Sequence, residues 1–275
     1  MDKLKFLTAG MPLSIEGKGY KNAFKKLNDL HLDGLEVEFV HGVRINTDSV
    51  IDIKQAVAEG FTVTCHGPFY INLNAREPEK VEASVNRILD TARTAKQFGG
   101  YSITYHAAFY MGNDKKVVFD RVAKQTEIIT NILNEEGNDI FIRPETTGKG
   151  TQWGDIEEIV ELSTMFDRVL PCVDFSHLHA RSGGAYNTYD EFCKVFELIG
   201  NKLGNFALEN FHAHVAGIEY SAKGEKKHLN LEESDMNYKD LLKAFKTFDV
   251  KGVIISESPN IEGDAKLMKE YYLSL

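Results

Sequence analysis

The feature that most limits the fold of this 275-residue chain is a regular alternation of short apolar segments with longer amphipathic ones. Eight segments have the length, the β-branched content and the flanking loop residues that are typical of buried strands. These segments are Lys5–Ala9, Gly34–Val40, Phe61–His66, Tyr101–His106, Asp139–Glu145, Val169–Asp174, Asn205–His214 and Gly252–Glu257. Their starts are separated by roughly 30 to 45 residues, which leaves room for a helix and two connections after each strand.

The stretches between these segments repeat apolar residues at the i, i+3/i+4 spacing of helices that bury one face. The predicted helices include Pro78–Phe98, Val117–Asn134, Asp155–Met165, Tyr189–Ile199, Tyr238–Phe248 and Gly263–Tyr272. Asp155 and the pair Asn187–Thr188 are expected to cap helix N-termini, and Gly137 is expected to end the helix that precedes it.

Eight strands that alternate with about eight helices predict an α/β fold, a (β/α)8 TIM barrel. No Pro/Gly/Ser-rich linker interrupts the pattern, so we expect one domain over residues 1–275. A doubly wound open sheet is the alternative fold. It would usually carry a glycine-rich phosphate loop after its first strand, whereas the sequence at this place is TAGMPLS. We therefore favour the barrel and expect no organic cofactor.

Composition excludes several classes of protein. Hydrophobic residues make up 43% of the chain, which is enough for a buried core. The longest apolar runs are far shorter than the roughly 20 residues of a membrane helix, and the first residues lack the apolar region of a signal peptide. The three cysteines have no metal-finger spacing and suit a reducing compartment. We expect a cytoplasmic protein without membrane contact, and the net charge of −9 weighs against a broad basic surface for nucleic acid.

Side chains that can carry chemistry are concentrated where the predicted strands end. The active site of a TIM barrel lies at the C-terminal ends of its strands, and seven of the nine histidines fall there or just beyond. Together with three carboxylates they form the candidate set His66, His106, Glu145, Asp174, His177, His179, His212, His214, His228 and Glu257. Random scatter along the chain would have placed several of these residues on helix faces.

So many carboxylates and imidazoles in one cavity repel one another or need to be desolvated, unless cations neutralise them. Mixed nitrogen and oxygen donors favour Zn²⁺, with Mn²⁺ or Fe²⁺ as alternatives in some sites. About eight ligands are too many for one tetrahedral ion, so we expect at least two metals that share a carboxylate. Two or three such ions suit phosphoryl transfer, whereas a single ion suits isomerisation of a sugar. Residue types alone leave both chemistries open.

Four segments resemble signatures of the endonuclease IV family, the family-2 apurinic/apyrimidinic endonucleases, which lies within the xylose isomerase-like TIM barrels. They are HGPFYINL at residues 66–73, PETTGKGTQWG at 144–154, CVDFSHLHA at 172–180 and IISES at 254–258. The resemblance runs in consistent order from about residue 60 to the end of the chain. Each motif alone carries little weight, but the combined set is specific.

The resemblance implies three metal sites, two of which share a glutamate. The implied ligands are His66, His106 and Glu145 for the first metal, Glu145, Asp174, His214 and Glu257 for the second, and His177 and His228 for the third. The family completes its third site with the aspartate of an Asp-x-His pair, but Lys226 stands at that position here. We therefore expect two or three zinc ions, with Glu225 as a third-site ligand only if this loop follows a different path.

The function that the resemblance implies is metal-dependent hydrolysis of phosphodiesters at abasic sites in duplex DNA, which is a DNA-repair reaction. Glu145 and Glu257 would be catalytic, the first by bridging two metals and the second by orienting the attacking hydroxide. Expected DNA contacts are Arg44, Phe69, Tyr70 and Lys227. The family's second-strand loop F-x-x-N-x-R-x-W is replaced here by FVHGVR with no following tryptophan.

The alternative function is that of a sugar isomerase or epimerase of the same superfamily. Its single divalent metal would be held by Glu145, Asp174, His214 or His212, and Glu257. Such an enzyme has less use for His66, His106, His177 and His228 together. We therefore favour a monomeric endonuclease IV-like hydrolase.

Overall fold

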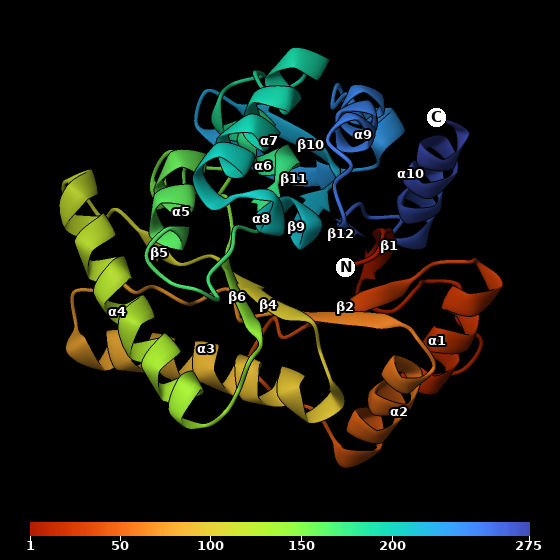
Figure 1. Cartoon of the computed structure of the whole chain (residues 1–275), viewed down its shortest axis with the longest axis horizontal. Coiled ribbons are helices and arrows are strands. Elements are labelled where there is room, and N and C mark those ends of the chain that lie inside the picture. The colour runs from red at the N-terminus through yellow and green to blue at the C-terminus, as the bar shows by residue number, and fades with distance from the viewer.

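The computed structural model describes residues 1–275 as a ring of parallel strands enclosed by helices (Figure 1). The strands pair in the order β6-β4-β3-β2-β1-β12-β9-β8. Their bounds are β1 Leu4–Ala9, β2 Gly34–Glu38, β3 Thr62–His66, β4 Ser102–Tyr105, β6 Phe141–Pro144, β8 Val173–Asp174, β9 Phe211–Val215 and β12 Gly252–Ser256. The single bridges Ile142–Val169 and Glu145–Cys172 join the two ends of this sheet. The predicted (β/α)8 TIM barrel is confirmed.

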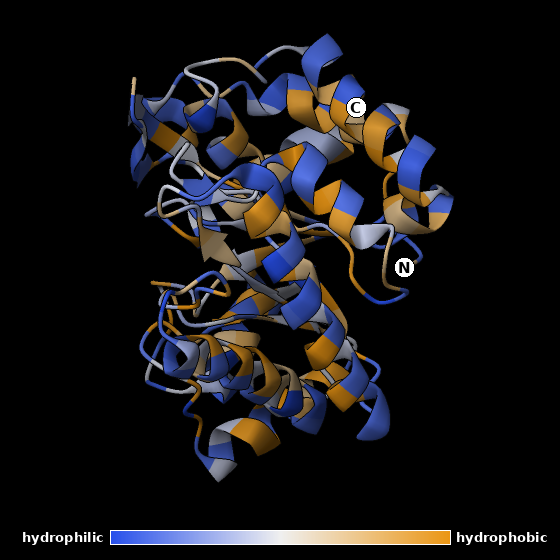
Figure 2. Ribbon diagram, turned by 90° about the vertical axis from the view of Figure 1, so that its left-hand side faces the viewer, coloured by the Kyte–Doolittle hydropathy of each residue, from blue (hydrophilic) through white to orange (hydrophobic).

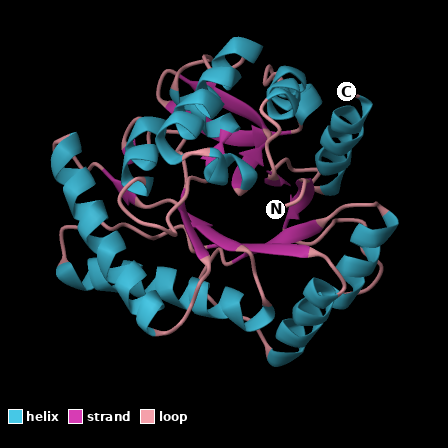
Figure 3. Ribbon diagram, in the orientation of Figure 1, coloured by secondary structure: helices cyan, strands magenta, loops and turns pink.

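Helices form the outer layer of the barrel (Figure 3). They are α1 Tyr20–Asp29, α2 Thr47–Ala58, α3 Pro78–Phe98, α4 Lys115–Glu135, α5 Ile156–Ser163, α6 Phe175–Arg181, α7 Tyr189–Leu203, α8 Asn205–Glu209, α9 Tyr238–Thr247 and α10 Glu262–Ser274, with a 3-10 turn η1 at Leu231–Glu233. The bounds predicted for α3 are confirmed, because proline begins it and Gly99, with a φ of 79°, ends it. Asp155 and Thr188 cap α5 and α7, each in a capping box.

Each surrounding helix buries an apolar face against the strands and leaves a polar face to solvent (Figure 2). The buried apolar side chains form one continuous cluster of 63 residues. Phe175, Phe196, Phe211 and Phe245 pack there, with the rings of Phe196 and Phe245 edge to face at 4.9 Å and those of Phe175 and Phe211 stacked at 6.4 Å. None of the helices combines the length and the apolar character that a bilayer-spanning segment requires.

The strand predicted at Asn205–His214 is wrong in its first half. Asn205–Glu209 forms the short helix α8, and β9 begins only at Phe211. Ala207 and Leu208 are adjacent and both buried, which the strict in-and-out alternation of a half-buried strand does not allow. The predicted strand Val169–Asp174 is likewise reduced to Val173–Asp174 and isolated bridges, because Pro171 has no N–H to donate to the ladder.

Two small antiparallel sheets, which were not predicted, extend the loops at the C-terminal ends of the strands. One pairs β5 Ala108–Phe109 with β7 Gln152–Trp153, and the other pairs β10 Gly217–Ser221 with β11 Gly224–Leu229. The second sheet is a hairpin that carries His228 to the barrel mouth. The three cysteines are unpaired.

Candidate metal centre

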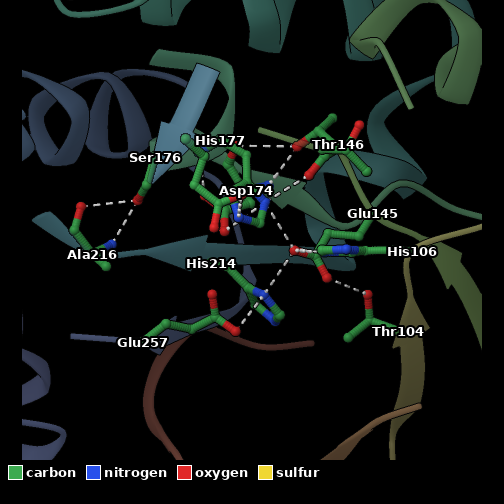
Figure 4. A network of polar contacts seen from close by, with 12 residues as sticks. Thr104, His106, Glu145, Thr146, Asp174, Ser176, His177, His214, Ala216 and Glu257 are labelled. Carbon is green, nitrogen blue, oxygen red and sulfur yellow. Dashed lines mark hydrogen bonds and ion pairs between the residues drawn. The ribbon is translucent and has the colours of Figure 1, made fainter. Parts of the chain in front are cut away.

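Glu145 lies at the centre of a polar cluster where the strands end (Figure 4). Its carboxylate is 1% exposed and lies 3.1 Å from Nε2 of both His66 and His106. Nδ1 of His177 and Nδ1 of His214 lie 3.2 and 3.5 Å from the same carboxylate. Burial opposes the ionisation of Glu145, but the neighbouring imidazoles outweigh it and hold its pKa well below the usual range. One ionised carboxylate thus faces four imidazoles.

Main-chain carbonyl groups engage one ring nitrogen of three histidines. Nδ1 of His66, His177 and His228 lies 2.7, 2.9 and 3.2 Å, respectively, from a carbonyl oxygen. A carbonyl oxygen can only accept a hydrogen bond, so Nδ1 carries a proton and Nε2 is the ring nitrogen left to bind a metal. Metal-binding histidines are commonly held in this way, with the second ring nitrogen donating to a fixed acceptor.

Three buried donor atoms of the cluster have no hydrogen-bond partner in the protein. They are Oδ2 of Asp174, Nδ1 of His214 and Nε2 of His228. An unsatisfied buried polar group costs about 1–3 kcal/mol, so native structures rarely contain several of them side by side. A divalent cation would supply the missing partner for each atom, and the mixed nitrogen and oxygen donors suit zinc. The residues present therefore fit the implied metals.

The eight ligands expected from the sequence all lie in this cluster. In three groups, every ligand atom lies within 4.8 Å of the others, namely His66–His106–Glu145, Glu145–Asp174–His214–Glu257 and Asp174–His177–His228. Glu145 is shared by the first two groups and Asp174 by the last two. Six of the ligands lie in strands or directly after them, α6 begins just after Asp174 and presents His177, and β11 presents His228.

A second layer of charged residues lies deeper in the barrel. Glu36 of β2 is fully buried, and its carboxylate lies 2.9 Å from Nε2 of His214 and 3.3 Å from Nε2 of His212. Burial opposes the ionisation of Glu36, but the charge of His214 outweighs it and lowers the Glu36 pKa below the usual range. Burial lowers the pKa of His212 to about 4, so this imidazole is neutral at neutral pH. Its Nδ1 lies 3.0 Å from Oγ of Ser102.

Glu36 is a residue that the sequence analysis missed. The signal was present in β2, where Glu36 and Glu38 interrupt an otherwise apolar strand at a spacing of two. That spacing places both carboxyl groups on one face, and in a barrel a buried charged face must have a function or a partner. Burial raises the pKa of Glu38 to about 8, so this carboxyl group is largely protonated at neutral pH.

The hairpin β10–β11 turns its lysines away from the cluster. The Lys226 ammonium lies 3.0 Å from one carboxylate oxygen of Glu219, and that of Lys227 lies 3.5 Å from the other. Glu225 is directed inward, with Oε2 3.6 Å from Nε2 of His177. Lys226 therefore does not enter the cluster in place of the expected aspartate. Lys227 likewise forms an ion pair with Glu219.

The other expected DNA contacts lie on loops of the barrel mouth. Phe69 and Tyr70 form the turn after β3, are 56% and 38% exposed, and have ring centroids 4.4 Å apart. His41, in the loop after β2, meets Phe69 edge to face at 5.7 Å. Arg44 is exposed in the same loop. The structure thus brings the two aromatic residues together and leaves Arg44 free in solvent.

Comparison with known sequences identifies relatives over the whole chain. The family described as "Xylose isomerase-like TIM barrel" matches residues 24–272. An uncharacterized protein of Methanocaldococcus jannaschii is 42% identical over 272 residues, which cover 99% of this chain and 98% of that protein. A protein of Oceanobacillus iheyensis named "Probable endonuclease 4" is 24% identical over 174 residues, which cover 62% of this chain and 56% of that protein.

Solved structures with the same fold include epimerase-like proteins and an endonuclease IV. A D-tagatose 3-epimerase-like protein superposes with a TM-score of 0.75 at 17% identity, covering 98% of this chain and 97% of that one. Endonuclease IV from Thermus thermophilus superposes with a TM-score of 0.72 at 17% identity, covering 98% of this chain and all of that one. At this identity the two superpositions establish the shared fold, and the choice between chemistries rests on the side chains.

Proposed function

The chain belongs to the xylose isomerase-like TIM barrel family, and from this premise we propose that it is a metal-dependent phosphodiesterase that incises duplex DNA at abasic sites. The observation that carries the proposal is the packing of three donor groups side by side, joined through Glu145 and Asp174. A one-metal enzyme needs only the group Glu145–Asp174–His214–Glu257. The additional histidines, His66, His106, His177 and His228, belong to the other two groups and support a centre of several metals. The relative named as a probable endonuclease supports the same assignment.

Each donor group would hold one divalent ion, zinc in the first place, with Mn²⁺ or Fe²⁺ as alternatives. When bound, these ions supply Lewis acidity to a phosphoryl group and activate water at neutral pH. Glu145 belongs to two donor groups, so this one carboxylate would be a ligand of both of the first two ions. The sharing of Glu145 would therefore hold the reacting groups at one defined separation.

Glu257 is the carboxylate of the cluster that reaches toward the opening, with 14% of its side chain exposed. Burial opposes its ionisation, but the charge of His214, 3.2 Å away, brings the pKa of Glu257 to about 2. It is therefore ionised throughout the neutral range. In the proposed reaction it binds a metal and accepts a hydrogen bond from the attacking water, which orients the water toward the phosphorus atom.

The exposed aromatic pair Phe69–Tyr70 suits a nucleotide that has lost its base. A missing base lowers the cost of turning the nucleotide out of the duplex, and an aromatic ring can stack in the gap that it leaves. Arg44 would contact phosphate from the neighbouring loop. Two or three divalent ions add four to six positive charges to a chain of net charge −9, and all of them lie at the barrel mouth. The site would thus attract phosphate although the chain is acidic.

The proposal is tested with the zinc-loaded full chain and an end-labelled duplex that contains one tetrahydrofuran abasic analogue. We expect incision at the analogue, loss of incision in excess chelator, and recovery when zinc is restored. The same duplex with an intact base pair is the control and is not expected to be cut. Absence of chelator-sensitive incision by the zinc-loaded chain would refute the proposal.

A second candidate function is epimerisation of a ketose. The group Glu145–Asp174–His214–Glu257 is a complete four-ligand site for one divalent ion, and this observation favours the second candidate independently of the other histidines. Turnover of a ketohexose by the chain loaded with one Mn²⁺, in the absence of incision, would select it.

A further inference from the structure

A β-bulge in the hairpin β10–β11 changes which residue shares a face with His228. Two consecutive residues of β10 pair with Lys227 and Glu225 of β11, so Lys226 is an extra residue without a partner in the register. Side chains alternate between the two faces of a strand, and an extra residue shifts this alternation by one position. Glu225 therefore lies on the face of His228, where a regular strand would have placed Lys226.

Close contact between two loops seats the Glu225 carboxylate against His177. The main-chain N–H of Glu225 donates to the carbonyl oxygen of Gly148 at 3.0 Å. A Cβ atom at Gly148 would lie 2.7 Å from both Cβ and Oε2 of Glu225 and 2.9 Å from Cδ2 of His177. A Cβ atom at Gly224, whose φ is 92°, would lie 2.3 Å from the carbonyl oxygen of Gly148. Only glycine at residue 148 lets the hairpin and this loop meet in this way.

The side chains that meet at this place can all serve as metal ligands. Nδ1 of His177 donates to a carbonyl oxygen, so Nε2 is the ring nitrogen that faces Glu225 Oε2, 3.6 Å away. That separation is too long for a hydrogen bond. Nε2 of His228 is buried without a hydrogen-bond partner, and Oδ2 of Asp174 also lacks a hydrogen bond, although it lies 3.1 Å from Nδ1 of His177. A shared cation is the simplest partner for such a group of donors.

We propose that Glu225 is the carboxylate that completes a third divalent-metal site with Asp174, His177 and His228. The inference rests on the proposed metal-dependent function and assigns a ligand within its centre. Two imidazole nitrogens and two carboxylate oxygens form a four-coordinate set that suits Zn²⁺. The bulge at Lys226 thus compensates for the missing aspartate, because it brings the preceding residue to the inner face.

The test is the number of Zn²⁺ ions bound by the full chain, measured by native mass spectrometry after the metal-free protein is loaded with zinc alone. We expect three ions in the wild type and two in Glu225→Gln. Lys226→Ala, the matched control on the outer side of the hairpin, is expected to keep three. Equal zinc counts in Glu225→Gln and the wild type would overturn the proposal, and so would a wild type that binds only two ions.

A double variant tests the role of the bulge. Lys226→Asp restores the expected aspartate, but on the outer face, so Glu225→Gln combined with Lys226→Asp should still bind two zinc ions. Recovery of the third ion in this variant would show that residue 226 can reach the site and would overturn the assignment. Anomalous diffraction at the zinc edge gives a second readout, with the peak next to His177 and His228 lost in Glu225→Gln and the others kept.

Zinc counts do not depend on the substrate. Three ions in the wild type and two in Glu225→Gln would therefore establish the ligand even if abasic DNA were not cut. Conversely, incision by a chain with only two ions would leave the proposed function in place and remove the third site. The two proposals thus fail separately.

Discussion

The two halves of the barrel mouth are built for different tasks. The loops that follow β1 to β4 contribute only His66 and His106 to the candidate ligands, whereas the elements from β6 to β12 contribute the other six. The first half instead exposes apolar side chains, namely Met11, Leu13, Val40, Phe69, Tyr70, Phe109 and Met111. Under the proposed function, the second half would hold most of the metal ligands and the first half the substrate, so variants in the two halves should affect different quantities.

One strand of the second half, β9, also connects the mouth to the buried layer below it. His214 presents Nδ1 to Glu145 and Glu257 and Nε2 to Glu36, so it joins the outer cluster to the buried layer below it. His212, two residues earlier on the same strand, belongs only to the deeper layer. Neighbouring histidines on one strand thus have different environments, and their variants should separate binding of metal from support of the barrel.

The largest effect is expected from Glu145→Gln, which removes the carboxylate shared by two donor groups. Both groups lose a charged ligand, so the chain should bind fewer zinc ions. Incision should fall by more than about 100-fold, which is the upper end of the loss caused when a partner behind a metal ligand is removed. Glu219→Gln, an exposed carboxylate on the hairpin, is the control and should retain full activity. A Glu145→Gln chain that keeps its zinc would show that the carboxylate is not shared.

A smaller effect is expected from Glu36→Gln, which weakens the buried partner of His214. The amide keeps the shape of the side chain but not its charge, so His214 becomes a weaker donor. Zinc affinity, measured by competition with a chromophoric chelator, should fall about 10- to 100-fold. Ser102→Ala removes a contact of His212 and should leave zinc affinity unchanged. Equal losses in both variants would mean that the deeper layer acts only through packing.

The pH dependence of the stability of the metal-free chain should distinguish the outer cluster from the deeper layer. Burial opposes protonation of His66, but Glu145 outweighs it and raises the pKa of His66 to about 10. The charges of Asp174 and Glu145 similarly raise the pKa of His177 to about 10 against the effect of burial. A histidine with a raised pKa stabilises the fold fully below its unfolded pKa of 6.5, and this contribution is lost as the pH rises through 10.

We therefore expect the urea midpoint of the metal-free chain to fall between about pH 6.5 and pH 10. Zinc replaces the protons on these imidazoles, so its affinity should rise over the same range. The pKa of His212 is shifted in the opposite direction, so its effect on stability is opposite too. Its pKa of about 4 lies below the unfolded value, so it destabilises the fold as the pH falls from 6.5 to 4. A urea midpoint, measured in chelator, that stays constant or increases between pH 6.5 and pH 10 would contradict this expectation.

The smallest effect on the metal centre is expected from the apolar half. Phe69→Ala and Tyr70→Ala remove rings that would stack on the substrate, at about 1–3 kcal/mol for each base-sized contact. KM for the abasic duplex should therefore rise with little change in kcat, while the zinc count stays the same. Phe206→Ala, an exposed ring on α8, is the matched control and should alter neither quantity. A loss of zinc in Phe69→Ala would contradict the division of the mouth into two halves.

Most of the fold followed from sequence patterns, because periodicity marks the elements. The ends of the predicted strands gave ten candidate residues at one place, and the resemblance to the endonuclease IV family selected eight of them as ligands. Three features could not be predicted in this way. Helix α8 depends on which side chains α7 and the barrel bury. The contact of Glu36 with His214 joins β2 to β9, which are far apart in the sequence. The inward position of Glu225 depends on a single extra residue in a hairpin that was not expected.

The most direct test of a centre of several metals adds zinc in steps to the metal-free chain and follows two reactions in parallel. One is incision of the abasic duplex and the other is epimerisation of a ketose, with a second series in Mn²⁺. The account predicts that incision appears only when more than one zinc ion is bound per chain, and that the ketose is not turned over at any loading. Full turnover of the ketose with one bound ion, and no incision at saturation, would contradict it.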